Sequence, residues 1–319
     1  MRRLTLPGFV LALIVVGAAF LSWTGAGPAP KPVAVVVPEG ATLRTIAREL
    51  EKTGAVGSGD RFFLLARLLG GSGVIRAGEY EVPRHASARE IVDLLQSGKT
   101  LQRFVTVSEG MPSIMVHEKL VGTPLLTGSV AVPAEGAVLP DSYSYQRGES
   151  RAAVLKRMTA AMDKTLAQLW RDRKPSAVVR SPAEAVNLAA IVEKETGVAS
   201  ERRMVAGVYS NRLRIGMPLQ ADPTVIYPVT RGKPLGRRIL RSELQADNGY
   251  NTYARPGLPA GPIANPGKAS IAAVLDPAPT KALYFVAKGD GGHVFAETLT
   301  EHNANVARWY ALRRSKGEM

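Results

Sequence analysis

The first thirty residues limit the possible folds of this chain more than any other segment. Arg2 and Arg3 precede a stretch without charges that runs from Leu4 to Pro30, with its apolar centre at Phe9 to Trp23. Roughly 20 apolar residues span a bilayer, and basic residues favour the cytoplasmic side. We therefore expect a single-pass transmembrane helix that places everything after Lys31 outside the inner membrane. The alternative is a cleaved signal peptide, which also exports the chain.

Charge and cysteine content narrow the class of protein further. The 319 residues include 41 Lys and Arg against 27 Asp and Glu, a formal net charge of +14, so anionic partners are favoured. Export removes cytoplasmic nucleic acid as a partner and leaves cell-wall polymers, anionic lipid or simply a solvated basic surface. No cysteine is present, which excludes disulfides, thiolate metal sites and a cysteine nucleophile.

The pattern of strands, helices and turns predicts an α+β fold in four parts. Residues 1–32 form a cytoplasmic tip, the anchor and a Gly/Pro linker, and residues 33–105 form a small α+β module. Residues 106–180 form a connecting region with a long helix capped by Ser150. Residues 181–319 form a mixed α+β domain, for which we expect catalysis.

The small module carries a pattern with two interpretations. A turn at Pro38 to Gly40 is followed by the cap Thr42 and by apolar residues at helical spacing up to Leu50. This segment resembles a LysM-like carbohydrate-binding module. The alternative is an ordinary helix packed on a strand.

A well-specified helix begins at residue 181. Ser181 is a capping residue, Pro182 suits the first helical position and Glu184 completes a capping box, while Gly197 offers a stop. At about 100° per residue, Glu195 lies within about 20° of Leu188 and thus faces the apolar arc. Glu193 points roughly 200° away from Glu195.

Two roles are open for Glu195. A carboxyl held in apolar surroundings without a cation has a raised pKa, as a general acid near neutral pH requires. The alternative is a buried structural acid paired with Arg202, Arg203 or Arg212.

Polar and aromatic loops follow this helix, and such loops suit neutral sugars, whose hydroxyls need paired donors and acceptors. The alternative for each of their residues is a turn-forming role. The spacing of His293 and His302 matches no zinc motif, so we expect neither a metal nor a cofactor. The candidate substrate-binding residues are Gln220, Asp222, Asn251, Tyr253 and Asn265.

Several motifs follow one another from about Ser181 to Asn303. They are Glu193-Lys194-Glu195-Thr196, Ala199-Ser200-Glu201-Arg202, Asn211-Arg212-Leu213-Arg214-Ile215-Gly216-Met217, Leu219-Gln220, Asp222-Pro223-Thr224-Val225-Ile226-Tyr227, Tyr250-Asn251-Thr252-Tyr253 and Gly291-Gly292-His293-x-Phe295. Together, in this order, they resemble the MltG/YceG family of endolytic murein transglycosylases. The chain departs from the family pattern in a shortened, glycine-rich connection before Leu139 and in Leu139 itself, where an aromatic residue is usual.

The resemblance implies an inner-membrane protein whose outer part cleaves nascent glycan strands between MurNAc and GlcNAc, leaving anhydro-MurNAc ends and terminating elongation. It implies that Glu195 is the catalytic acid/base and that penicillin-binding synthases are partners. The alternative function is a catalytically silent peptidoglycan-binding scaffold. Within the enzymes, a hydrolase is the nearest alternative.

Overall fold

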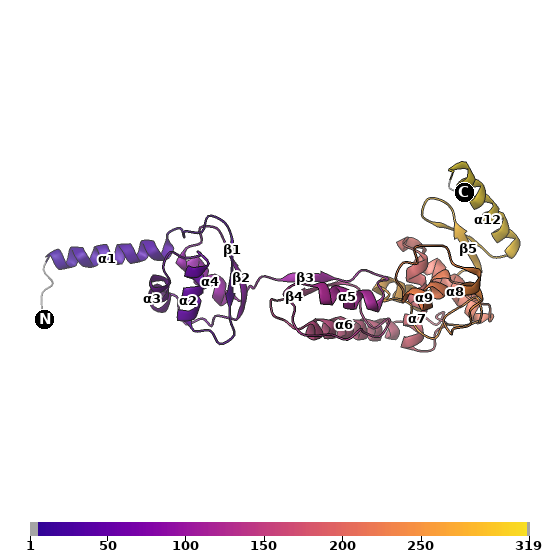
Figure 1. Cartoon of the computed structure of the whole chain (residues 1–319), viewed down its shortest axis with the longest axis horizontal. Helices are drawn as coiled ribbons and strands as arrows, with labels where there is room; N and C mark the ends of the chain where they lie inside the picture. The colour runs from indigo at the N-terminus through magenta and orange to yellow at the C-terminus, as the bar shows by residue number, and fades with distance from the viewer. Residues whose placement is uncertain (1–5, 318–319) are drawn as a thin grey trace. The chain divides into compact units, whose positions relative to one another are not determined.

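The computed structural model describes residues 6–317, and its α+β chain divides into two units (Figure 1). The first unit comprises the chain up to Arg103 together with residues 144–148. The second unit comprises residues 104–143 and the chain from Glu149 onward. Strands β3 and β4, which form a two-stranded sheet, contain two of the three points at which the chain passes from one unit to the other, and the third follows Gly148. The elements up to β3 are α1 (Leu6–Thr24), β1 (Val33–Val37), α2 (Leu43–Lys52), α3 (Gly59–Leu69), β2 (Gly78–Val82), α4 (Ala88–Ser97) and β3 (Arg103–Thr106).

The first unit is a two-stranded antiparallel sheet covered by helices. β1 pairs with β2 from Val33↔Val82 to Val37↔Gly78, and α2, α3 and α4 gather beside this sheet in Figure 1. Thr42 caps α2 as the sequence predicts, since its side chain accepts a hydrogen bond from the Thr45 N–H. The LysM-like interpretation of this unit, and glycan binding by it, stay predictions.

The prediction of an N-terminal transmembrane helix is wrong. Within residues 6–317, no helix combines the length and the apolar character that crossing a membrane requires. α1 has 19 residues, but its last turn belongs to the core of the first unit, where Trp23 is only 8% exposed and Ala19 packs beside it. Because this turn is committed to protein packing, α1 offers lipid fewer than the roughly 20 residues that a bilayer needs. The predicted cytoplasmic Arg2 and Arg3 lie outside the described residues.

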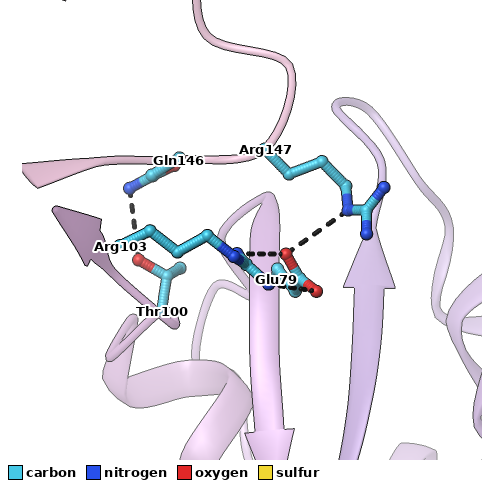
Figure 2. Close-up of polar contacts among 5 residues, drawn as sticks. All are labelled: Glu79, Thr100, Arg103, Gln146 and Arg147. Carbon is cyan, nitrogen blue, oxygen red and sulfur yellow. Dashed lines mark hydrogen bonds and ion pairs between the residues drawn. The ribbon is translucent and has the colours of Figure 1, made fainter. Parts of the chain in front are cut away.

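A buried carboxylate fastens the returning segment 144–148 to the first unit (Figure 2). Glu79 on β2 is 3% exposed and accepts two hydrogen bonds from Arg103, at 2.7 and 3.1 Å, and one from Arg147 at 3.3 Å. Hydrogen bonding from Arg103 is the largest effect on the pKa of Glu79 and holds it below its ordinary value. Gln146 donates to the Thr100 hydroxyl at 3.2 Å alongside. Glu79 thus binds Arg103, where the chain leaves the first unit, and Arg147, where the chain has returned to it.

The second unit is built around α7, in which every residue from Ala185 to Val192 is buried. α8 and α11 pack on α7, and α6 from the predicted connecting region shares the same core through Met162. Figure 1 shows α12 beside β5. The elements after β3 are α5 (Ser113–Gly122), β4 (Ser142–Tyr145), α6 (Arg151–Arg171), α7 (Pro182–Glu195), the 3₁₀ turn η1 (Ala199–Glu201), α8 (Arg202–Arg214), α9 (Asp222–Thr230), α10 (Arg241–Gln245), α11 (Lys268–Leu275), β5 (Tyr284–Ala287), β6 (His293–Ala296) and α12 (Leu299–Ser315).

Candidate active site

The start and the end of α7 determine where Glu195 lies. The Ser181 side chain accepts from the Glu184 N–H at 3.1 Å and Pro182 occupies the first turn, as predicted. The Glu184 carboxylate accepts from the Arg180 N–H rather than from Ser181, so the predicted capping box is only half formed. α7 ends at Glu195, and Thr196 is already extended at φ −137° and ψ 128°. Glu195 therefore projects from the last turn of a helix whose central residues, 185–192, are all buried.

The surroundings of Glu195 move its titration towards neutral pH. The residue retains partial exposure, but desolvation of its carboxyl group raises the pKa from 4.5 to about 7. Interaction with the Tyr209 side chain lowers this pKa, the charge of Asp222 raises it further, and the Arg212 guanidinium lowers it. Burial is the largest of these effects, so the raised pKa comes from the same packing that forms the core.

Glu195 is not the structural ion-paired acid of the alternative interpretation. Among residues 6–317, no cationic side chain forms a salt bridge with it. Arg202 pairs with Glu109 at 3.1 Å, and Arg203 pairs with Asp276 at 3.0 Å. Arg212 is buried but donates to backbone carbonyls, at 2.7 Å to Leu283 and 2.6 Å to Leu219.

Glu193 is the structural acid of α7. Its side chain is 5% exposed, lies 3.4 Å from the Arg202 guanidinium and accepts from the Gly267 N–H at 2.8 Å. These bonds tie α7 to α8 and to the N-cap of α11. The two glutamates of the motif therefore have different environments. Glu193 is paired with Arg202, whereas Glu195 has no ion-pair partner among the described residues.

Buried threonines bring together two of the loops that the sequence singles out. The Thr252 hydroxyl accepts from the Ala221 N–H at 3.0 Å and shares a hydrogen bond with the Thr224 hydroxyl at 2.9 Å. This link aligns the start of α9 with the turn at residue 253. As a result, the Tyr253 hydroxyl donates to the Asp222 carboxylate at 2.6 Å. The charge of Asp222 raises the pKa of Glu195, and the charge of Glu195 raises the pKa of Tyr253. Both residues therefore share the site of Glu195.

The five predicted substrate-binding residues therefore fall into two groups. Gln220, Asp222 and Tyr253 keep side-chain surface exposed near α9, and Gln220 has a left-handed backbone at φ 51°. Asn251 and Asn265 are buried at 3% and 0% exposure. The amide of Asn251 bonds to the backbone of residues 243, 244, 246 and 253, and that of Asn265 bonds to residues 111, 113, 135 and 138. Both amides are buried and bond to the protein through nitrogen and oxygen, which favours the turn-forming alternative for these two residues.

Sequence reasoning passed over two residues of this region. Tyr209 is 2% exposed and reaches Glu195 from α8, one turn before Arg212. The sequence signal for Tyr209 is its spacing from Arg212, because residues three apart on a helix lie on the same face. Glu135 lies in a segment that looked like plain connection, and it accepts from the Ser113 N–H, the Asn265 amide and the Tyr227 hydroxyl. Burial raises its pKa, but no feature of the local sequence indicated this.

The arrangement can carry out acid–base chemistry with a single carboxyl. A group with a pKa near 7 is protonated often enough to donate to a leaving oxygen and basic enough to take a proton back. Asp222 and Tyr253 form a polar rim beside it. This defines a class of protein, namely an acid–base enzyme whose site is formed where α7, α8 and α9 meet.

The chain belongs to the YceG-like family, whose sequence profile it matches over residues 35–308. It is 29% identical over 317 residues to the endolytic murein transglycosylase of Bacillus subtilis, covering 89% of this chain and 86% of that protein. It is 28% identical to the endolytic murein transglycosylase of Streptococcus pneumoniae D39, of whose length the match covers 58%. The crystal structure of a yceG-like protein from Listeria monocytogenes superposes with a TM-score of 0.56 at 27% identity, covering 86% of this chain and 98% of that one.

Proposed function

We propose that this chain is an endolytic murein transglycosylase, a lyase that cleaves peptidoglycan strands with Glu195 as its one acid/base. Family membership and the names of its relatives support the activity. The single observation that carries the role of Glu195 is a desolvated carboxyl, without a salt bridge among the described residues, whose pKa is raised to about 7. No observation favours the scaffold alternative.

The chemistry needs only one carboxyl because the substrate itself supplies the nucleophile. Protonated Glu195 donates its proton to the glycosidic oxygen as the bond from MurNAc C1 to that oxygen breaks, and GlcNAc leaves with a free hydroxyl. The N-acetyl group of MurNAc can stabilise the oxocarbenium-like centre. The Glu195 carboxylate then takes the proton of the MurNAc C6 hydroxyl, whose oxygen bonds to C1. The anhydro ring closes, Glu195 is protonated again and no water is consumed.

Product analysis distinguishes this reaction from hydrolysis. Ordinary glycosidases use two carboxylates, and a hydrolase at this site would use water as the nucleophile in place of the MurNAc C6 hydroxyl. We expect purified protein to release, from uncrosslinked glycan strands, products that mass spectrometry identifies as anhydro-ended. Products heavier by one water, with a reducing end, would show a hydrolase. Internal fragments early in digestion are expected for an endolytic enzyme, whereas release of single disaccharides would contradict that mode of action.

The substrate suggests where in the cell the reaction takes place, and the family resemblance suggests its partners. We infer that the catalytic unit acts outside the cytoplasmic membrane, where nascent glycan is exposed, and that it works beside penicillin-binding synthases and terminates their strands. The family resemblance supports this association.

A further inference from the structure

A pocket of about 490 Å³ adjoins the proposed reaction centre. Two of its lining residues, Lys194 and Pro223, are the chain neighbours of Glu195 and Asp222. Glu195 itself does not line it. Consecutive Cα atoms lie about 3.8 Å apart, so the pocket begins one residue from the acid/base without containing it.

The walls of the pocket are mainly apolar. Methionine, proline, isoleucine and leucine side chains supply most of its surface, among them Met111 and Met115. Gly232 has φ +85°, and a Cβ added there would lie 2.6 Å from the Pro112 Cβ. A Cβ at Gly110 would lie 3.4 Å from the Lys194 Cδ, an ordinary contact distance, so the aliphatic stem of Lys194 passes close to Gly110. At Gly232 the close approach to Pro112 requires glycine.

One positive charge on this wall is not neutralised. The other charged groups that line the pocket have partners: Lys233 pairs with Glu118 at 2.6 Å, and Glu109 pairs with Arg202 at 3.1 Å. Lys194 is exposed and forms no salt bridge among the residues that the structure describes. The ligand that fits is therefore small, largely apolar and carries a carboxylate.

We propose that this pocket binds the peptide stem of the substrate, with the Lys194 ammonium pairing a stem carboxylate. The inference rests on the proposed function. In peptidoglycan the stem hangs from the lactyl group of MurNAc, the sugar whose glycosidic bond Glu195 would break. The stem therefore leaves the glycan within a few bonds of the reacting carbon, and its methyl-bearing residues and free carboxylates match the apolar walls and the ammonium. The enzyme thereby prefers strands that still carry stems.

Two substrates test this preference in the full chain. Uncrosslinked strands and the same strands stripped of stems by an amidase are compared by kcat/KM for anhydro ends. We expect the wild type to favour stem-bearing strands, and Lys194→Met to lower the ratio of the two values by up to about fivefold, the upper end of the range for an exposed ion pair. Lys194→Glu should lower it further, since it repels the carboxylate. Any effect of residue 194 on the pKa of Glu195 acts on both substrates and cancels in the ratio.

The matched control is Lys164→Met, an exposed lysine of α6 outside the pocket, which should keep the wild-type ratio. A wild type that does not discriminate between the substrates, or a Lys194→Met variant with the wild-type ratio, would overturn the stem-binding proposal and leave the transglycosylase intact. Absence of anhydro ends from both substrates with the wild type would instead overturn the proposed function and this proposal with it.

Discussion

Glu195→Gln is expected to reduce the formation of anhydro ends by at least about 10³-fold while the fold is retained. General acid–base catalysis contributes typically 10²- to 10⁴-fold, and here one carboxyl performs both the donation and the withdrawal of the proton. A glutamine amide has almost the same shape but can do neither. The rate is measured by mass spectrometry of anhydro-ended products, and binding of intact strands should persist because the polar rim of Asp222 and Tyr253 is unchanged.

The same variant has a stability signature that depends on pH. The folded-state pKa of Glu195 is about 7 against an ordinary 4.5, so ionised Glu195 costs the folded state about 3 kcal/mol. This cost is absent below pH 4.5, where the carboxyl is protonated in both states, and it is complete above pH 7. Glu195→Gln should therefore melt higher than wild type at pH 8 and almost equally at pH 4. Exposed Glu297→Gln should change neither activity nor melting, and an active Glu195→Gln would refute the assignment.

Glu193→Ala is expected to destabilise the second unit by about 3 kcal/mol, through a different mechanism on the same helix turn. Removing one member of a buried pair leaves an uncompensated charge, which costs typically 3–5 kcal/mol. Arg202 retains Glu109 as a second partner at 3.1 Å, which places the loss at the lower end. The Gly267 N–H also loses its acceptor. Thermal and urea unfolding measure the loss.

Two comparisons make the Glu193 result specific. Glu193→Gln retains an oxygen for Gly267 and should be destabilised less than the alanine variant, and Glu297→Ala should unfold like the wild type. Folded Glu193→Ala protein should keep substantial activity at low temperature. Full stability with lost activity would contradict the structural role and would move catalysis to Glu193.

The sequence predicts the local elements of the site well because their signals are local. Ser181 and Pro182 mark the start of α7, and its helical period places Glu195 on the apolar arc, as found. Long-range contacts carry no such signal. The threonine pair 224 and 252 joins residues 28 apart in the chain, and Asn265 meets groups up to 154 residues away. An asparagine in a turn-rich loop looks the same in the sequence whether it binds sugar or backbone.

The error at the N-terminus has the same origin. Composition alone made the stretch from Leu4 to Pro30 resemble a membrane span, because hydropathy does not report what packs against a helix. Trp23, the last residue of the apolar centre, packs in the core of the first unit. For Glu193, the helical period correctly predicts that the side chain faces away from Glu195. It does not predict that the side chain is buried against Arg202 and Gly267, because those contacts come from other parts of the chain.

The most direct test of this account is the pKa of the Glu195 carboxyl, followed by ¹³C NMR titration of labelled wild type and two variants. We expect about 7 in the wild type. Tyr209→Phe should raise the value, because it removes an interaction that lowers the pKa, and Asp222→Asn should lower it, because it removes a neighbouring negative charge. Glu195→Gln identifies the resonance. A wild-type value near 4.5 that neither variant moves would contradict the claim that a single desolvated, protonated acid performs the reaction.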